Sequence, residues 1–176
     1  MGDVFKEQIV KRKQTGMDSL KRVGLVVAMI IVFIIALVVV PYIAPGLAFL
    51  TPVLILLAGF GAFFLNGLLK VEYEYIFTNG ELDIDIIYNR SRRKRAFSSH
   101  VNKFDIMAHV EDMTHAGAFH GAQETKDFSS GAVGENTYAF LVNYNSKRTK
   151  VIIEPNEKMM DAMKGSISRS KLHLKR

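Results

Sequence analysis

The stretch VGLVVAMIIVFIIALVVVPYIAPGLAFLTPVLILLAGFGAFFLNGLL, residues 23–69, decides the fold class because it contains no Asp, Glu, Lys, Arg or His. At about 1.5 Å per residue, residues 23–43 are long enough to cross a hydrocarbon core of about 30 Å. Pro41, Pro45 and Gly46 then predict a tight turn, and residues 47–69 supply a second apolar run. We therefore expect a transmembrane helical hairpin with helices at about 23–43 and 47–69.

The length of this block argues against a cleaved signal peptide and against a buried core helix. A signal peptide has an apolar stretch of about 7–15 residues, far shorter than this one. A buried core helix would need a large soluble shell, and the chain of 176 residues leaves only about a hundred after Lys70.

The flanking charges predict the orientation of the hairpin. Lys21 and Arg22 precede the first helix, Lys70 follows the second, and the turn between them has no charge. By the positive-inside rule both chain termini face the cytoplasm and the turn faces outward. The expected location is the plasma membrane, and the formal net charge of +6 suits an anionic membrane surface.

Residues 1–22 form a basic cytosolic segment in which residues 3–20 are expected to be a short amphipathic helix on the inner leaflet. Its apolar side would consist of Val4, Phe5, Ile9 and Val10. The Met1-Gly2 start is not a myristoylation signal, because position 6 is Lys where that motif requires Ser or Thr.

A patch of small residues, Ala58 to Ala62 with Gly59 and Gly61, lies in the second apolar run. Small residues let helices approach closely. We expect contact within the hairpin, with a homo-oligomer as the alternative use.

Residues 71–167 are expected to form a cytosolic, mostly β domain. VEYEYIFT (71–78) and ELDIDIIY (81–88) alternate apolar and polar residues, and Asn79-Gly80 between them favours a two-residue hairpin turn. This turn pairs Thr78 with Glu81, which sets Glu74 opposite Asp85. Like charges in that position are unfavourable, so a cationic neighbour is expected beside them.

The basic cluster that follows has two candidate uses. It consists of Arg90, Arg92, Arg93, Lys94 and Arg95. As a third strand it would neutralise the acidic face formed by Glu74, Asp83 and Asp85. Alternatively, because the second strand returns toward the start of the first, the cluster would lie at headgroup level and contact anionic lipid.

The remaining segments complete an α+β domain. Another strand is expected within residues 97–110. Residues 111–136 are expected to form a long loop with a helical turn near 115–122. Residues 137–144 and 149–154 predict a second hairpin. Asn156 is the expected N-cap of a helix at 156–167, whose apolar face toward the core includes Met159, Met160 and Met163. Residues 168–176 are expected to form a basic tail. The fold class is therefore a membrane α-hairpin plus an antiparallel sheet or partly closed barrel with a C-terminal helix.

Several segments resemble known families. The run YEYIFTNGELDIDIIYNRSRRKRAF is similar to the opening of bacterial pleckstrin-homology-like (PH-like) domains. MGDVFKEQIVKRK at the start, NRSRRKR at 89–95, DFSSG at 127–131 and IIEPNEKMMDAM at 152–163 resemble an uncharacterised family of small two-helix membrane proteins from Gram-positive anaerobes. The resemblance implies a PH-like fold and no catalytic residues.

The sequence carries no recognisable motif for catalysis or cofactor binding. The chain has no cysteine, no glycine-rich phosphate loop and no nucleophile elbow. His115 and His120 are five residues apart, without the spacing of a helical metal site, although Glu111 and Asp112 nearby leave a metal site in the loop open.

The sequence predicts a non-enzymatic protein- or lipid-interaction module without cofactor or metal. Its expected partners are the bilayer, anionic headgroups and another membrane or cytosolic protein. The alternative is a membrane-tethered nucleic-acid binder using residues 90–95, disfavoured because no aromatic residues interleave the charges.

Overall fold

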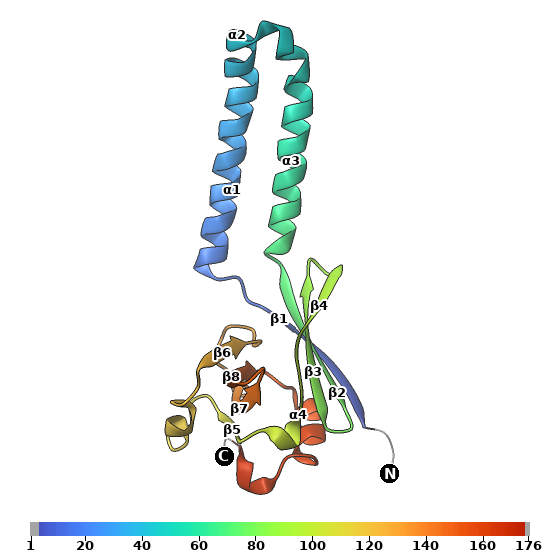
Figure 1. Cartoon of the computed structure of the whole chain (residues 1–176), viewed down its shortest axis with the longest axis vertical. Coiled ribbons are helices and arrows are strands. Elements are labelled where there is room, and N and C mark those ends of the chain that lie inside the picture. The colour runs from blue at the N-terminus through green and yellow to red at the C-terminus, as the bar shows by residue number, and fades with distance from the viewer. Residues whose placement is uncertain (1–3, 175–176) are drawn as a thin grey trace. The chain divides into compact units, whose positions relative to one another are not determined.

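The computed structural model describes residues 4–174 and divides the chain into two compact units. One unit consists of the chain up to Lys13 together with Val71 onward, and the other of residues 14–70. The first unit is therefore discontinuous in sequence. Figure 1 shows its two sheets and the helical hairpin that forms the second unit.

The first sheet has four antiparallel strands in the order β1-β2-β3-β4. They are β1 (Phe5–Lys11), β2 (Val71–Thr78), β3 (Glu81–Tyr88) and β4 (Arg92–His100). The predicted β2–β3 hairpin and its register are confirmed, with Thr78 paired to Glu81 and Glu74 to Asp85. Asn79 and Gly80 have φ of 49° and 94°, as the two-residue turn requires. A Cβ at Gly80 would also lie 2.6 Å from the His100 ring, so this ring would have to move to admit a larger residue.

Strand β1 overturns the expected amphipathic helix at 3–20. Residues Phe5–Lys11 pair with β2 over their whole length, from Phe5 opposite Thr78 to Lys11 opposite Glu72. Only Val10 of β1 enters the core, while Phe5 and Ile9 remain exposed. A weak alternation with one buried residue resembles an amphipathic helix locally, and only pairing with a distant strand decides between the two. Position 3 of that expectation, and the Met1-Gly2 start, lie outside the described residues.

The second sheet has the order β6-β8-β7-β5-β9. Its strands are β5 (Ile106–His109), β6 (Glu124–Asp127), β7 (Tyr138–Tyr144), β8 (Lys147–Ile153) and β9 (Leu172–His173). The second hairpin is confirmed as β7–β8, although its turn is only Asn145-Ser146, both at positive φ. Short 3₁₀ helices span Val101–Lys103, Ala116–Phe119 and Arg169–Lys171.

Two predicted irregular segments contribute strands to this sheet. The loop at 111–136 contains the expected helical turn, but also β6, which pairs in parallel with β8. The tail at 168–176 contains β9, which pairs in parallel with β5; its last two residues lie outside the described part. Parallel partners are brought together by long connections, so no local turn signal announces them.

Helix α4 (Glu157–Lys164) and both sheets share one core. The Asn156 side chain accepts a hydrogen bond from the Met159 N–H at 2.8 Å, and the three methionines face inward, as predicted. Within residues 4–174 the architecture is α+β with two sheets, the second of them mixed, in place of the single antiparallel sheet or partly closed barrel that was expected. The residues expected to form a single core are all buried in one cluster: Tyr73, Tyr75, Leu82, Ile84, Phe140, Val142 and Met163.

Two side chains link the sheets where backbone pairing does not. The Gln8 amide donates to the Glu154 carbonyl at 2.8 Å and accepts from the Asn156 N–H at 2.7 Å. The Tyr75 hydroxyl donates to the Phe128 carbonyl at 2.6 Å and accepts from the Glu154 N–H at 3.2 Å. Burial raises the pKa of the Tyr75 phenol. These bonds satisfy backbone groups just after β6 and β8, at the corner where the two sheets meet.

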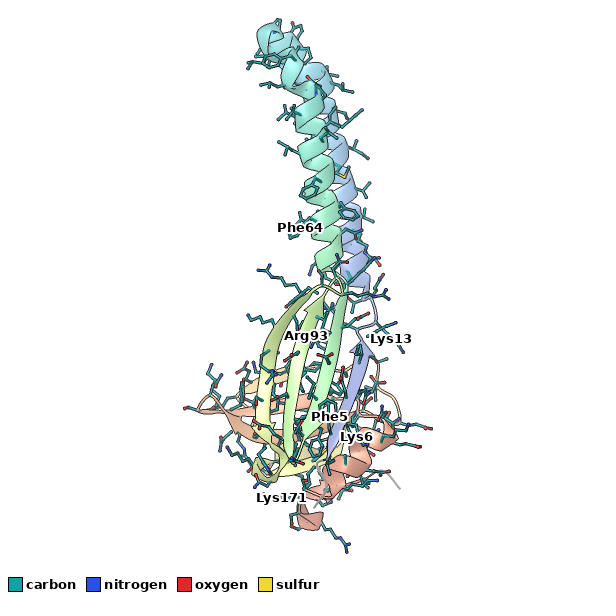
Figure 2. All side chains as sticks on the ribbon, turned by 90° about the vertical axis from the view of Figure 1, so that its right-hand side faces the viewer. Phe5, Lys6, Lys13, Phe64, Arg93 and Lys171 are labelled. Atoms are coloured by element: carbon teal, nitrogen blue, oxygen red, sulfur yellow. The ribbon has the colours of Figure 1, made fainter. Side chains whose placement is uncertain are left out.

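The second unit contains α1 (Gly16–Ile34), a π-helical stretch at Ile35–Val39 and α2 (Val40–Ile43). A 3₁₀ helix at Pro45–Leu50 then leads into α3 (Thr51–Leu68). The spans Gly16–Ile43 and Pro45–Gly67 are long and apolar enough to cross a membrane. Most of their large apolar side chains are exposed, and Phe64 projects outward from α3 (Figure 2).

The turn of the hairpin has a specific polar contact. In the π-helical pattern the Ala36 carbonyl would accept from residue 41, but Pro41 has no N–H. The buried Thr51 hydroxyl donates to this carbonyl instead, at 3.3 Å. Pro52 lies in the first turn of α3, where its missing N–H has no cost.

Candidate functional site

Strand β4 divides the predicted basic cluster between two faces of the first sheet. The register shifts between Ile84 and Asp85, which leaves Ala96 as an extra residue in β4. Beyond this bulge, Arg93 and Arg95 lie on the outer face with Glu74 and Asp85. Arg92 and Lys94 alternate with them and lie on the other face.

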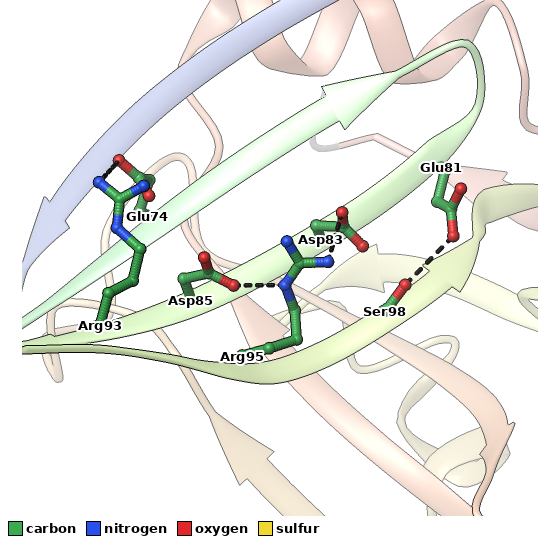
Figure 3. A network of polar contacts seen from close by, with 7 residues as sticks. All are labelled: Glu74, Glu81, Asp83, Asp85, Arg93, Arg95 and Ser98. Atoms are coloured by element: carbon green, nitrogen blue, oxygen red, sulfur yellow. Dashed lines mark hydrogen bonds and ion pairs between the residues drawn. The ribbon is translucent and has the colours of Figure 1, made fainter.

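Ion pairs occupy the outer face, as expected for a third strand beside an acidic ladder (Figure 3). Arg93 Nη2 lies 2.9 Å from Glu74 Oε1, and Arg95 contacts Asp83 at 2.6 Å and Asp85 at 2.5 Å. The Ser98 hydroxyl donates to Glu81 at 3.2 Å, nearer the β2–β3 turn. Arg93 and Arg95 are therefore structural partners of the β2 and β3 carboxylates.

Glu74 is the most buried acid of this network, with 1% of its surface exposed. Its burial raises the pKa of the carboxyl group, and the adjacent Arg93 guanidinium opposes that shift. Glu7 of β1 raises the pKa further, because its side chain approaches the same carboxyl group. The carboxylates of the outer face are thus paired with neighbouring arginines and do not form a free acidic surface.

The remaining cations gather at one end of the first sheet. Tyr88 pairs with both Val71 and Arg92, so the β3–β4 turn lies beside the start of β2. Lys11 ends β1 at the same level, opposite Glu72. We call Lys11, Arg90, Arg92 and Lys94 the basic end; all four are exposed, and Arg90 lies 3.5 Å from Glu72. The predicted cluster did not include Lys11, because residues 3–20 were expected to form a helix and not a neighbour of β2.

A separate, open pocket of about 680 Å³ lies between residues 109–115 and strand β9, and its lining includes His109, Asp112, His115 and His173. His115 stacks on His173 with ring centroids 3.7 Å apart, and its Nδ1 lies 2.6 Å from Asp112 Oδ2. This hydrogen bond lowers the pKa of Asp112. Within residues 4–174, no three His, Asp or Glu side chains are placed to hold a metal ion.

The buried His109 has a structural role. Its Nδ1 accepts from the Glu111 N–H at 3.2 Å, so the ring proton belongs on Nε2, which lies 3.0 Å from the Gly134 carbonyl. The ring therefore fastens both ends of the loop to β5. His100 similarly accepts from the Asn102 N–H and caps a 3₁₀ turn.

Comparison with known proteins gives one match. No curated protein and no solved structure matches the chain. A family model described as "Bacterial PH-like domain (DUF6106)" matches residues 2–172, which include the hairpin as well as both sheets. The chain therefore belongs to this family of bacterial PH-like domains.

Proposed function

We propose that this chain is an integral protein of the bacterial plasma membrane whose PH-like domain acts as a non-enzymatic interaction module at the cytoplasmic surface. The helical hairpin is its anchor, and the basic end contacts anionic lipid headgroups. The rest of the domain surface is available to a membrane or cytosolic protein.

The observation that carries this proposal is the insertion of the hairpin between two adjacent strands. Lys11 of β1 pairs with Glu72 of β2, and the Arg12 N–H donates to the Val71 carbonyl at 3.2 Å. Both ends of the hairpin thus leave one folded domain at neighbouring points. A membrane segment with both ends on one side must cross an even number of times, which agrees with two helices of sufficient length.

The hairpin surface supports a membrane environment. Large apolar side chains along both helices are exposed, including Ile30 at 53%, Leu56 at 73% and Phe63 at 77%. In water such a continuous apolar surface would drive association. In a bilayer it is the surface that lipid chains cover, and the helices satisfy their own backbone groups.

The basic end supports headgroup contact. Lys70 directly precedes Val71, so the Val71 end of β2 lies only a few residues from the end of α3. Arg92 and Lys94 are at that end of the sheet, and each cation near an anionic surface contributes about 1 kcal/mol. The nucleic-acid alternative is less well supported, since Arg93 and Arg95 are held in ion pairs.

Topology is tested in intact cells with single-cysteine variants of this cysteine-free chain. Gly46→Cys, at the hairpin turn, should react with an impermeant thiol reagent from outside. Glu135→Cys, in an exposed loop of the domain, should react only after lysis. Labelling of Glu135→Cys in intact cells would contradict the proposed orientation.

Headgroup contact is tested on the full chain in liposomes, with a fluorophore on Ser91→Cys and quencher-labelled headgroups. Phosphatidylglycerol should increase quenching over phosphatidylcholine, and Arg92→Gln with Lys94→Gln should abolish the difference. The matched control is Lys147→Gln with Lys158→Gln, which removes the same charge from exposed sites elsewhere. Equal quenching in both lipids would show that the basic end does not contact headgroups.

A further inference from the structure

A groove of about 430 Å³ lies between α1 and α3, entirely within the helical hairpin. Its volume is in the range of ligand-binding cavities in proteins. Arg22 of α1 and Asn66 of α3 line one end, and Met29 and Gly59 line the other. On each helix, the residue at one end of the groove is seven residues from the residue at the other end, so the groove is about 10 Å long.

Small residues keep the groove open. Gly59 and Ala62 of α3 line it, and a Cβ added at Gly59 would meet no atom within 4 Å. The small-residue patch was expected to bring the two helices into close contact. At Gly59 it leaves space beside α1 instead, flanked by the apolar side chains of Leu25 and Val26.

The polar end of the groove is cationic. Arg22 Nη1 donates to Gln14 at 2.7 Å, whereas Nε and Nη2 are buried and have no hydrogen-bond partner among residues 4–174. Asp18, one turn before Arg22, accepts hydrogen bonds from the Thr15 N–H and hydroxyl in a capping box. Unpartnered guanidinium donors favour an anionic acceptor, and phosphate oxygens suit their geometry. Because protein atoms cover these two nitrogens, a phosphate in the groove reaches them when the Arg22 side chain turns toward it.

We propose that this groove binds one anionic phospholipid, with its phosphate on Arg22 and the upper part of one acyl chain along Gly59 and Ala62. The site rests on the proposed membrane insertion, because the groove then opens to lipid at the end of the apolar run. Its depth of about 10 Å lies within one leaflet of a core about 30 Å thick. Basic pockets between membrane helices are suited to such headgroups.

The test uses the full chain in mild detergent and counts bound lipids by native mass spectrometry. Phosphatidylglycerol and phosphatidylcholine with identical acyl chains are the probes. The wild type should retain one phosphatidylglycerol and prefer it to phosphatidylcholine by about tenfold or more. Hydrogen bonds to a charged group are strong enough to change an affinity by about that factor. Arg22→Gln should lose the preference, while Lys21→Gln, an equal charge change on an exposed neighbour outside the groove, should keep it.

A second variant separates the acyl-chain contact from the charge. Gly59→Leu should fill the groove and abolish retention of phosphatidylglycerol with no change in charge. Equal retention by the wild type and Arg22→Gln, or retention by Gly59→Leu, would overturn the proposal. A dimer that Gly59→Leu dissociates, without lipid dependence, would also overturn it and identify a second copy as the occupant.

Liposome flotation distinguishes failure of this site from failure of the proposed function. If all variants float with liposomes and resist carbonate extraction but retain no specific lipid, only the lipid site is refuted. If the wild type itself does not float, the membrane anchor is refuted, and the lipid site with it.

Discussion

Strands β1 and β4 form the two edges of the first sheet, but they reach those edges by different routes. β4 follows β3 after the short turn at residues 89–91, whereas the helical hairpin separates β1 from β2 in the chain. β4 brings arginines to the acidic face and Phe97 to the core. β1 brings Val10 to the core and Gln8 to the corner between the sheets.

The position of β4 follows from the residues next to it in sequence, whereas the position of β1 depends on contacts with a distant part of the chain. The acidic ladder of β2 and β3 requires neighbouring cations, and the next segment supplies them. Nothing near β1 in sequence indicates its partner, because that partner begins only at Val71. The strand that brings the two ends of the hairpin together therefore carries no local signal of its partner.

The largest effect should follow from removing β1. A fragment that starts at Val71 lacks the whole edge strand, the Gln8 links and the hydrogen bond from the Lys13 N–H to the Ser130 carbonyl at 2.7 Å. We expect it to lack a cooperative unfolding transition. A joined domain, in which a short turn replaces residues 14–70, should fold as a soluble monomer, since Arg12 and Val71 are already hydrogen-bonded.

Circular dichroism with thermal and urea unfolding checks this prediction on both proteins. Cooperative unfolding of the fragment at the same midpoint as the joined domain would show that β1 is dispensable. It would also support the expectation that residues 71–167 form a domain.

The β2–β3 hairpin could be predicted residue by residue, because alternation and Asn79-Gly80 specify both strands and register. The ion pairs of Arg93 and Arg95 followed from the charge conflict at Glu74. β6 and β9 could not be found, since four-residue and two-residue strands with parallel partners have little periodicity. The groove at Arg22 requires the relative placement of two helices, and sequence spacing alone does not contain it.

A smaller effect should distinguish the two edges by their core residues. Phe97 is fully buried and packs near Phe140 and Tyr144, with ring centroids 5.6 and 4.9 Å away. Phe97→Ala should lower the free energy of unfolding by about 3–5 kcal/mol. Val10→Ala removes two methyl groups and should cost about 2 kcal/mol. Urea unfolding of the joined domain measures both, and an equal loss would mean that the edges contribute alike.

Smaller again should be the effect of the polar link from β1. Gln8→Ala leaves the Glu154 carbonyl and the Asn156 N–H without their side-chain partner. We expect a loss of about 1 kcal/mol, because both hydrogen bonds are only partly shielded from water. Lys6→Ala, at an exposed position of the same strand, should change stability by less than about 0.5 kcal/mol. If both variants matched the wild type, water would replace the link without loss.

The smallest effect concerns the outer face, where Glu7 of β1 and Arg93 of β4 act on Glu74 with opposite sign. Because burial raises the pKa of Glu74 above its ordinary value of 4.5, the folded state binds more protons than the unfolded state just above that pH. Stability should therefore fall as pH rises from about 4.5 through the raised pKa.

Glu74→Gln should remove this part of the dependence of stability on pH and be at least as stable as the wild type at neutral pH. Arg93→Gln should steepen the slope, since the guanidinium opposes the shift, while Glu135→Gln at an exposed site should leave it unchanged. Urea unfolding of the joined domain between pH 4 and 8 measures these slopes. A Glu74→Gln variant that lost stability at neutral pH would show instead that attraction to Arg93 outweighs burial.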